Sequence, residues 1–310
     1  VFFISHIIPA DPAAFAAGEN ASAETVAAVR AKLGLDQPLH IQFLRYIQSV
    51  AQGDMGRSIY TGRPIADDLM SRLPATIELA IFAILVASII GVPLGVISAL
   101  YRNSWLDHVL RVVTIAGLAM ASFWVAIILQ LTFSMRLGMT PLTGRVDGWG
   151  PEPITGFYTV DALLMQDPEI LVDALHHMIL PVITLALPAT ATIVRFTRAG
   201  VLNALSSNYV LYETAMGYPR RLIIWKYVLR NALIGTVTQI GLIFGILLAG
   251  AVVVEAVFDW PGLGLFAVNS ILSSDYNAVL GFTLVAGTMF IVVNLVVDIL
   301  QGMIDPRETR

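Results

Sequence analysis

The chain's lysines decide whether it can bind the phosphates of ATP through a P-loop. That motif needs Gly-x-x-x-x-Gly-Lys followed by serine or threonine, so that backbone amides and the lysine surround the phosphates. The chain has two lysines, Lys32 and Lys226, and neither follows a glycine. The sequence therefore contains no P-loop, and an ATP-driven process that involves this chain needs an ATPase on another chain.

Ionisable side chains inside apolar segments are the next candidates for chemistry. Membrane proteins keep such groups where they transfer ions or form hydrogen bonds between helices. Glu78, Glu255 and Asp298 each lie near an end of an apolar segment. Positions near segment ends favour interfacial anchoring or hydrogen bonds between helices, and a proton relay is the alternative.

The adjacent histidines His176 and His177 are the obvious candidates for metal binding. Neighbouring residues on a helix point about 100° apart, so these two rings do not converge on one ion. No His-Glu-x-x-His pattern is present either. We therefore predict no metal site, no catalytic residues and no cofactor in this chain, and we interpret the histidines as an interfacial helix start.

The composition indicates which elements must position these residues. The chain is 57% hydrophobic and 13% charged, whereas soluble domains carry about 25% charged residues. A helix needs about 20 apolar residues to cross about 30 Å of hydrocarbon, and it must satisfy its own backbone hydrogen bonds there. We predict an all-α polytopic membrane protein with spans at 75–100, 109–135, 177–200, 231–257 and 278–303.

Two further features belong to this set of spans. Residues 1–8 read VFFISHII, which we interpret as the last turns of a truncated first helix, with a short buried anchor as the alternative; the total is then six spans. Pro74 is expected to open the second span, where its missing N–H costs little. Interior prolines, such as Pro93, are expected to kink their helices. These kinks are tolerated within a bundle.

Arginines and lysines in the short loops set the expected orientation, because cytoplasmic loops carry an excess of them. Segments 101–111 and 195–230 and the C-terminal tail are rich in arginine, whereas 258–277 has no arginine or lysine. We therefore expect the first three to be cytoplasmic. There is no run of basic residues, so we expect no nucleic-acid partner.

Segment 9–73 is expected to form a small helical cap on the outer face. Ser22 is a candidate helix cap. Further along, Leu39, Phe43, Ile47 and Val50 recur at a helical spacing. The permease body would then comprise residues 74–310.

Segment 203–230 is polar at its ends and carries small residues in its middle, which permit close approach of another surface. Gly217-Tyr218-Pro219 is a turn signal that should separate two short helices. The residue types alone leave two alternatives open, a docking surface and a solvated loop.

The same segment resembles the EAA loop of ATP-binding-cassette importer permeases of the dipeptide/oligopeptide/nickel branch. It keeps Asn208-Tyr209, Ala215, Gly217 and Arg230-Asn231-Ala232, and it departs from the branch at Tyr212, Glu213, Thr214, Met216 and Gly235. Other stretches match in order along nearly the whole chain. They are Ile8 to Pro12, Leu33 to Pro38, Gly53 to Ser58, Arg195 to Arg198 and, most specifically, Val254 to Gly264.

The resemblance implies a type I importer permease in the bacterial inner membrane, with a cytoplasmic C-terminus. Its implied partners are a second homologous permease, two ABC ATPase subunits that hold ATP and Mg, and a periplasmic or lipid-anchored solute-binding protein. The pore would lie between the two permeases. Peptides, glutathione, nickel chelates and sugar-like compounds all stay open as substrates, and segment 143–175 has no assigned role.

The resemblance also implies which residues couple this chain to the ATPase. Tyr209, Glu213, Ala215 and Gly217 would form the docking helix, and Arg198, Arg220, Arg221 and Arg230 its cationic frame. Polar residues in the spans could line the pore or equally hold helices together. These are Ser122, Trp124, Gln130, Thr132 and Gln239.

Overall fold

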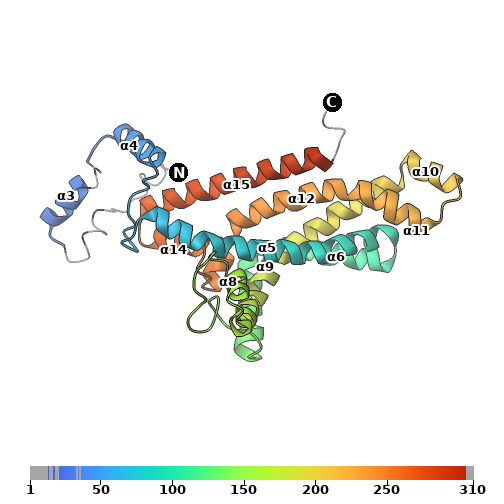
Figure 1. Cartoon of the computed structure of the whole chain (residues 1–310), viewed down its shortest axis with the longest axis horizontal. Coiled ribbons are helices and arrows are strands. Elements are labelled where there is room, and N and C mark those ends of the chain that lie inside the picture. Colours follow the sequence, from blue (N-terminus) through green and yellow to red (C-terminus); the bar gives the residue numbers. More distant parts are fainter. Residues whose placement is uncertain (1–12, 14–16, 18–20, 33, 35, 305–310) are drawn as a thin grey trace.

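The computed structural model describes residues 13, 17, 21–32, 34 and 36–304, and this part consists of helices joined by loops, with one isolated bridge between Arg57 and Pro64. Long helices lie side by side along the longest axis of the molecule (Figure 1). In order, the elements are α3 (Ala23–Lys32), α4 (Leu39–Ala51), α5 (Ile65–Leu100), α6 (Trp105–Ala119), α7 (Ser122–Leu129), the π-helix η1 (Gln130–Arg136), α8 (Tyr158–Leu164), α9 (Pro168–Leu205), α10 (Asn208–Ala215), α11 (Arg220–Leu222), the π-helix η2 (Ile223–Val228), α12 (Leu229–Gly250), α13 (Val252–Val257), α14 (Leu263–Leu272) and α15 (Tyr276–Ile304).

Four helical stretches of the described chain are long and apolar enough to cross a membrane: Ile65–Leu100, Pro168–Leu205, Arg220–Ala249 and Tyr276–Ile299. Helix α6 and the α7–η1 unit are also long and apolar enough when taken together, but the chain bends by 99° between them. If they count as one broken span, the described part has a fifth. Residues 1–8, expected to end a first helix, lie outside the described residues. The described part thus holds four or five of the six expected spans.

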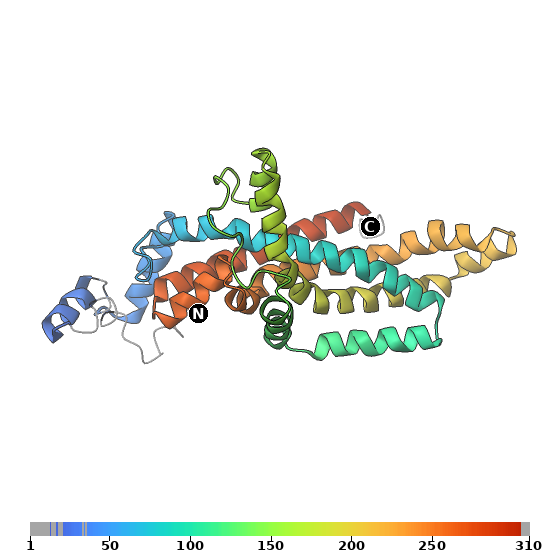
Figure 2. The same cartoon turned by 90° about the horizontal axis from the view of Figure 1, so that it is seen from below.

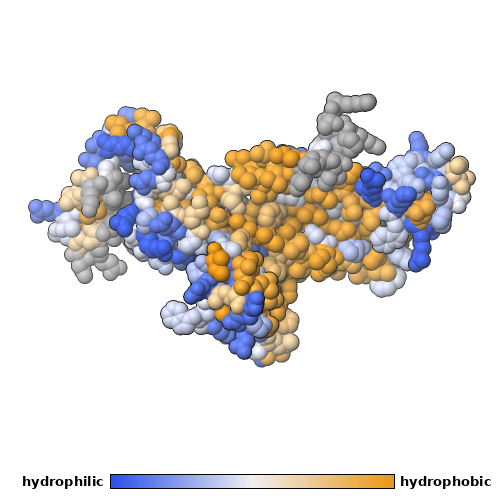
Figure 3. Space-filling view, in the orientation of Figure 1, coloured by the Kyte–Doolittle hydropathy of each residue, from blue (hydrophilic) through white to orange (hydrophobic). Residues whose placement is uncertain are grey.

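Hydrophobic side chains cover the middle of the visible face, and hydrophilic residues gather at the two ends of the long axis (Figure 3). Large apolar residues such as Ile89 and Ile115 are 71% and 67% exposed. A soluble protein rarely leaves an apolar belt of this kind uncovered. The belt is therefore the surface that faces lipid or neighbouring membrane helices.

The second expected span begins earlier than predicted. Helix α5 starts at Ile65 rather than at residue 75, and Pro74 lies inside it, so the prediction that Pro74 opens the span is wrong. The reason is tertiary packing, because Ile65 and Leu69 are buried against Leu263 and Phe266. These contacts stabilise the helical turns that precede the proline.

The third expected span is not one straight helix. Met120 and Ala121 have extended backbone, with ψ angles of 129° and 128°, and they separate α6 from α7. The extended pair interrupts the i to i+4 hydrogen bonds that continue a helix. The chain then leaves the bundle through α7 and η1 toward the protruding part around α8 (Figures 1 and 2).

The spans expected at 177–200 and 231–257 also differ from their predicted bounds. Helix α15, in contrast, agrees closely with the span expected at 278–303. Helix α9 begins at Pro168 rather than at 177, because the Asp167 side chain caps it by accepting from the Glu169 and Ile170 amides. The fifth helical stretch begins at Arg220 rather than at 231 and ends at Gly250 rather than at 257. Its early start follows from Ile223 and Val228, which are buried in the core.

Within segment 9–73 the structure describes two helices, α3 and α4, followed by a loop over 52–64 that contains the bridge between Arg57 and Pro64. Helices α3 and α4 lie at one end of the long axis, and α10 lies at the other (Figure 1). Helix α4 has no fully buried residue; of the apolar stripe predicted for it, Leu39 and Ile47 are 43% and 47% exposed, whereas Phe43 and Val50 are half-buried. The last residues of the segment belong to α5 and not to the cap.

Helices α5 and α9 pack closely because small residues of α5 meet α9. A Cβ added to Gly91 would lie 2.8 Å from Cγ2 of Ile193, and one added to Gly95 would lie 2.6 Å from Cβ of Thr197. These glycines are four residues apart and so share one face of the helix. Small residues at this spacing permit close approach of membrane helices.

Replacing Gly95 with alanine should therefore destabilise the protein by about 1–3 kcal/mol, the usual cost of overpacking a core. The added methyl group also lies 2.8 Å from the Val194 carbonyl oxygen, which cannot rotate away. The measurement is the melting temperature of the purified protein in detergent. Gly235→Ala on α12 is the matched control, because its Cβ meets no atom within 4 Å; equal shifts for both variants would contradict the packing argument.

Candidate functional site

A helical hairpin links the end of α9 to the start of α12 and forms the end of the molecule opposite α3 and α4 (Figure 1). Its first arm is α10 and its second arm runs through α11 and η2. Gly217 turns the chain between them with a φ of +81°, a conformation that glycine adopts without strain. Pro219 then precedes α11 with a φ of −67°. The predicted break at Gly217-Tyr218-Pro219 is thus confirmed, but only α10 is a short helix, because the helical stretch after the break runs from Arg220 to Ala249.

Exposed apolar side chains gather on this hairpin. Helix α10 has no buried residue. Leu211, Tyr212 and Met216 are 72%, 63% and 61% exposed, and Ala215 and Gly217 are exposed beside them. Tyr212 and Met216 are two of the positions at which the sequence departs from the EAA pattern. These two departures therefore lie on the outward surface of the hairpin.

Tyr209 and Glu213 form the inner side of α10. They are four residues apart, so they share one face of the helix, and both are half-buried. The Tyr209 hydroxyl and Oε2 of Glu213 are buried and form no hydrogen bond within the described chain. An unsatisfied buried polar atom costs about 1–3 kcal/mol. These two predicted residues thus keep unused hydrogen-bonding capacity beside the exposed apolar surface.

A groove of about 900 Å³ runs from this hairpin along α12. It is lined by two residues predicted from the sequence, Tyr209 on α10 and Arg230 at the start of α12. Arg220, Arg221 and Arg230 are all exposed. The hairpin therefore combines an apolar tip with cationic side chains and an adjoining groove, which are features of a protein-binding surface.

Arg198 is placed differently from the other predicted arginines. Its Nε and Nη2 donate to the two carboxylate oxygens of Asp107 at 2.9 and 3.0 Å. Asp107 is fully buried and also accepts from Ser98 at 2.6 Å and from Arg111 at 2.6 Å. Two-pronged arginine–carboxylate pairs fix geometry. Arg198 thus ties α9 to α6. The sequence analysis missed Asp107, although its spacing of four residues from Arg111 is a detectable signal.

The predicted pore residues fall on three elements. Ser122 and Trp124 lie on α7, with Gln130 and Thr132 on η1, whereas Gln239 lies on α12. The Gln130 amide donates to backbone carbonyls of Leu142 and Val257 at 2.8 and 3.3 Å. For Gln130, these bonds to the loop at Leu142 and to α13 agree with the alternative that it holds elements together.

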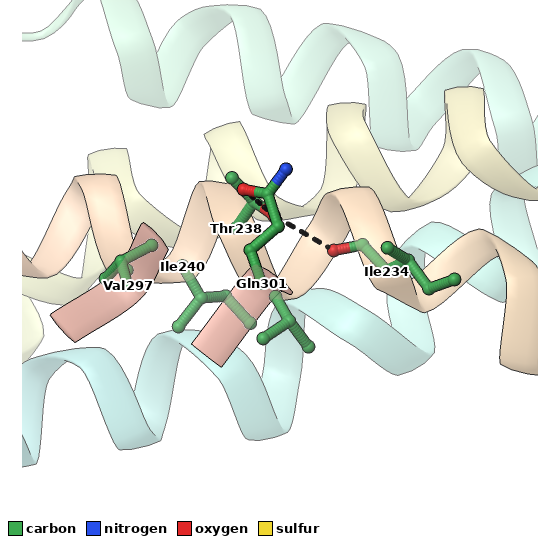
Figure 4. Close-up of a pocket in the computed structure, with 7 residues that line it drawn as sticks. Ile234, Thr238, Ile240, Val297 and Gln301 are labelled. Atoms are coloured by element: carbon green, nitrogen blue, oxygen red, sulfur yellow. Dashed lines mark hydrogen bonds between the residues drawn. The ribbon is translucent and has the colours of Figure 1, made fainter. Parts of the chain in front are cut away.

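Polar residues that the sequence analysis did not select meet between α12 and α15. The Thr238 hydroxyl donates to Oε1 of Gln301 at 3.0 Å. Both side chains line a mostly apolar cavity of about 180 Å³ (Figure 4). The cavity also includes Ile234 and Val297. Thr238 and Gln301 could have been selected on the same ground as Gln239, because each is a polar residue in an apolar span.

The two buried glutamates hold elements together at the end of the bundle where α13 and α14 lie. Glu255 accepts from the Thr76 hydroxyl at 2.7 Å and from the amides of Gly264 and Leu265 at 2.6 and 3.2 Å. The Trp260 indole donates to the Ala75 carbonyl at 3.0 Å. These contacts explain the motif from Val254 to Gly264 as the junction that ties α13 and α14 to α5.

Glu78 anchors the segment whose role the sequence left open. Arg145 is buried, donates to the Glu78 carboxylate and stacks 3.6 Å from the centre of the Tyr158 ring. Thr159 donates to the same carboxylate through its amide at 2.8 Å and its hydroxyl at 2.6 Å. Both glutamates therefore make structural hydrogen bonds, which agrees with the first of the two alternatives given for them.

Asp161 orders the loop that carries Arg145. It is buried on α8 and accepts from Thr155, through the amide at 2.8 Å and the hydroxyl at 2.6 Å, and from the Gly156 amide at 2.9 Å. Burial alone would raise the pKa of Asp161, but these hydrogen bonds outweigh it and hold the pKa below its usual value. Segment 143–175 is thus held in a defined conformation by hydrogen bonds and by the ion pair with α5.

Family models match both parts of the chain. The binding-protein-dependent transport system inner membrane component family matches residues 91–310. The N-terminal model of the corresponding transport-system membrane components matches residues 1–80.

Several curated proteins are similar over nearly the whole chain. The probable D,D-dipeptide transport system permease protein DdpB of Escherichia coli K12 is 46% identical over 100% of this chain and 92% of that protein. The dipeptide transport system permease protein DppB of the same strain is 39% identical over 99% of this chain and 92% of that protein. The glutathione transport system permease protein GsiC of Salmonella paratyphi A is 37% identical over 99% and 91%, respectively.

A solved structure shares the fold. One chain of the inward-facing MetNI methionine ABC transporter matches with a TM-score of 0.57 and 14% sequence identity, covering 74% of this chain and 93% of that chain. At this identity the match concerns the arrangement of helices alone.

Proposed function

This chain belongs to the family of binding-protein-dependent transport system inner membrane components, and from that premise we propose that it is the peptide-specific permease subunit of an ATP-driven importer. The family consists of multi-pass inner-membrane permeases that work in a complex with other subunits and are not ATPases. The substrate we propose is a dipeptide, in line with the relatives that are dipeptide permeases.

The single observation that carries the coupling mechanism is the hairpin of α10 and α11. It presents exposed apolar and cationic residues at the end of the molecule opposite α3 and α4. We propose that this end and the C-terminus are cytoplasmic and that α10 binds an ABC ATPase. The outer cap and the region around Asp259 would meet a solute-binding protein.

The proposed complex contains this chain, a second homologous permease and two ATPase subunits, which hold ATP and Mg. ATP binding would draw the ATPases together, and α10 would pass that movement to the bundle. Rigid-body movement of packed elements is an established way to switch access. Within this chain the hairpin can transmit force because α11 and η2 continue into α12, and Ile223 and Val228 anchor them in the core.

Uptake by reconstituted proteoliposomes tests the proposal. The complex co-purified with this chain is reconstituted with its binding protein outside and ATP inside, and a labelled D,D-dipeptide, an L,L-dipeptide and glutathione are compared. We expect dipeptide uptake that needs ATP hydrolysis and survives an ionophore. Uptake without ATP that a proton gradient drives would instead identify a secondary transporter, and a preference for glutathione would overturn the proposed substrate.

A further inference from the structure

The ring of His177 occupies a buried position between two carboxylates. Its side chain is 1% exposed. Nδ1 lies 2.9 Å from the Asp173 carbonyl oxygen and 3.1 Å from Oδ1 of the same residue. Both of these neighbours are acceptors, so Nδ1 carries the proton in the neutral ring. The lone pair of the histidine is therefore on Nε2.

Nε2 of His177 points at a third residue without bonding to it. It is buried, forms no hydrogen bond and lies 3.5 Å from Oδ1 of Asp147. Asp147 belongs to the loop before α8, and its amide donates to Oδ2 of Asp173 at 2.7 Å. That bond fixes the loop beside α9. Its carboxylate is 89% exposed, so it is free to adjust to a ligand.

The geometry fits a metal ion between Nε2 and Asp147. Ligand atoms of Asp147, Asp173 and His177 lie within 4.8 Å of one another. Two ligands of a tetrahedral zinc ion, with bonds of about 2.0–2.2 Å, are about 3.4 Å apart, and the observed separation is 3.5 Å. A histidine whose other nitrogen donates to a carboxylate is the usual arrangement at zinc sites.

We propose that Asp147 and His177 bind a divalent metal ion of the zinc class, with Asp173 orienting the imidazole. An imidazole ligand favours zinc and its transition-metal neighbours over calcium or magnesium, which prefer oxygen ligands. Water fills the remaining coordination positions. The site lies on the protruding part around α8, where hydrophilic residues reach the surface (Figure 3).

This proposal departs from the prediction of no metal site, although the reason given for that prediction holds. His176 and His177 do not converge, because Nε2 of His176 lies 2.8 Å from the Met139 carbonyl oxygen. The second ligand beside His177 is instead Asp147, from the loop before α8, and Asp173, one turn earlier on α9, orients the ring. Spacing along the sequence could not reveal that the loop carrying Asp147 folds back onto α9.

A bound ion would strengthen a junction that the fold already uses. Asp147 follows Arg145 by two residues, and Arg145 is paired with Glu78 of α5. Metal binding would therefore hold the loop against α9 at one point while the buried ion pair holds it against α5 at another. The expected consequence is higher thermal stability of the permease when zinc is present.

Zinc titration of the intact complex in nanodiscs tests the site, with a tag that contains no histidine and after removal of metals by EDTA. We expect zinc to raise the melting temperature of the wild type. Asp147→Asn should weaken zinc binding at this site by at least about tenfold and remove the shift. Since Asp147 is exposed, this variant should fold normally. Glu152→Gln, which changes an exposed acid of the same loop, is the matched control.

Experiments with cobalt and calcium distinguish a specific metal site from nonspecific attraction of cations to acidic residues. Cobalt should give the absorption bands of nitrogen–oxygen coordination in the wild type and in Glu152→Gln, and it should lose them in Asp147→Asn. The inference is overturned if Asp147→Asn binds zinc as tightly as the wild type does. It is also overturned if calcium raises the melting temperature as much as zinc.

Discussion

Replacing Gly217 with arginine should strongly reduce ATP-driven uptake while the complex still assembles in the membrane. A Cβ at this position meets no atom of the chain within 4 Å, so the new side chain points into the space where the proposed ATPase binds. Typical coupling free energies of about 1–3 kcal/mol correspond to about 5- to 150-fold effects. We therefore expect at least a fivefold loss of uptake.

The backbone at Gly217 requires a control of its own. The φ of +81° costs a residue with a side chain about 1–2 kcal/mol, which could by itself distort the hairpin. Gly217→Asn is the matched variant, because asparagine tolerates this region and adds little bulk. Uptake and ATPase activity are measured for both variants in proteoliposomes. Normal uptake by Gly217→Arg would remove α10 from the coupling site.

Replacing Glu255 with alanine should produce the largest loss of stability in the bundle. The Thr76 hydroxyl and the amides of Gly264 and Leu265 would lose their acceptor in a buried site. Each unsatisfied group costs about 1–3 kcal/mol, so we expect the loss of the acceptor for three groups to cost at least about 3 kcal/mol. The measurements are the amount of chain recovered from membranes and its melting temperature.

The conservative variant Glu255→Gln separates hydrogen bonding from packing, because it keeps an acceptor oxygen and the side-chain volume. We expect its stability to lie between those of the wild type and Glu255→Ala. Glu152→Ala, at an exposed acid, should change stability little. If Glu255→Ala melted at the same temperature as the wild type, the junction between α5, α13 and α14 would not depend on this carboxyl group.

The sequence predicted an element correctly where residues close together in the chain determine its conformation. The apolar run of α15 and the turn at Gly217 were predicted correctly, because hydrophobicity over about 20 residues and the conformational freedom of glycine fix them. Pro74 misled the prediction because packing of Ile65 and Leu69 carries the helix past it. The break at Met120 and Ala121 has no glycine or proline to mark it.

At the candidate sites, the contacts that could not be predicted join residues that are far apart along the chain. The sequence suggested Arg198 as part of a docking surface, but its buried partner Asp107 is 91 residues away along the chain. Likewise, nothing local indicated that Arg145 pairs with Glu78 or that Asp147 approaches His177. The docking role proposed for α10 could be formulated from the sequence because Tyr209, Glu213 and Ala215 lie on a single short helix.

Cysteine cross-linking from α10 tests the central claim, that this hairpin binds the ATPase, most directly. The chain has no cysteines, so Ala215→Cys on the exposed surface of α10 and Asp54→Cys at the opposite end each provide a unique thiol. In the assembled complex, Ala215→Cys should cross-link to an ATPase subunit and Asp54→Cys to the solute-binding protein. A cross-link from Ala215→Cys to the binding protein, or from Asp54→Cys to the ATPase, would contradict both the proposed orientation and the coupling site.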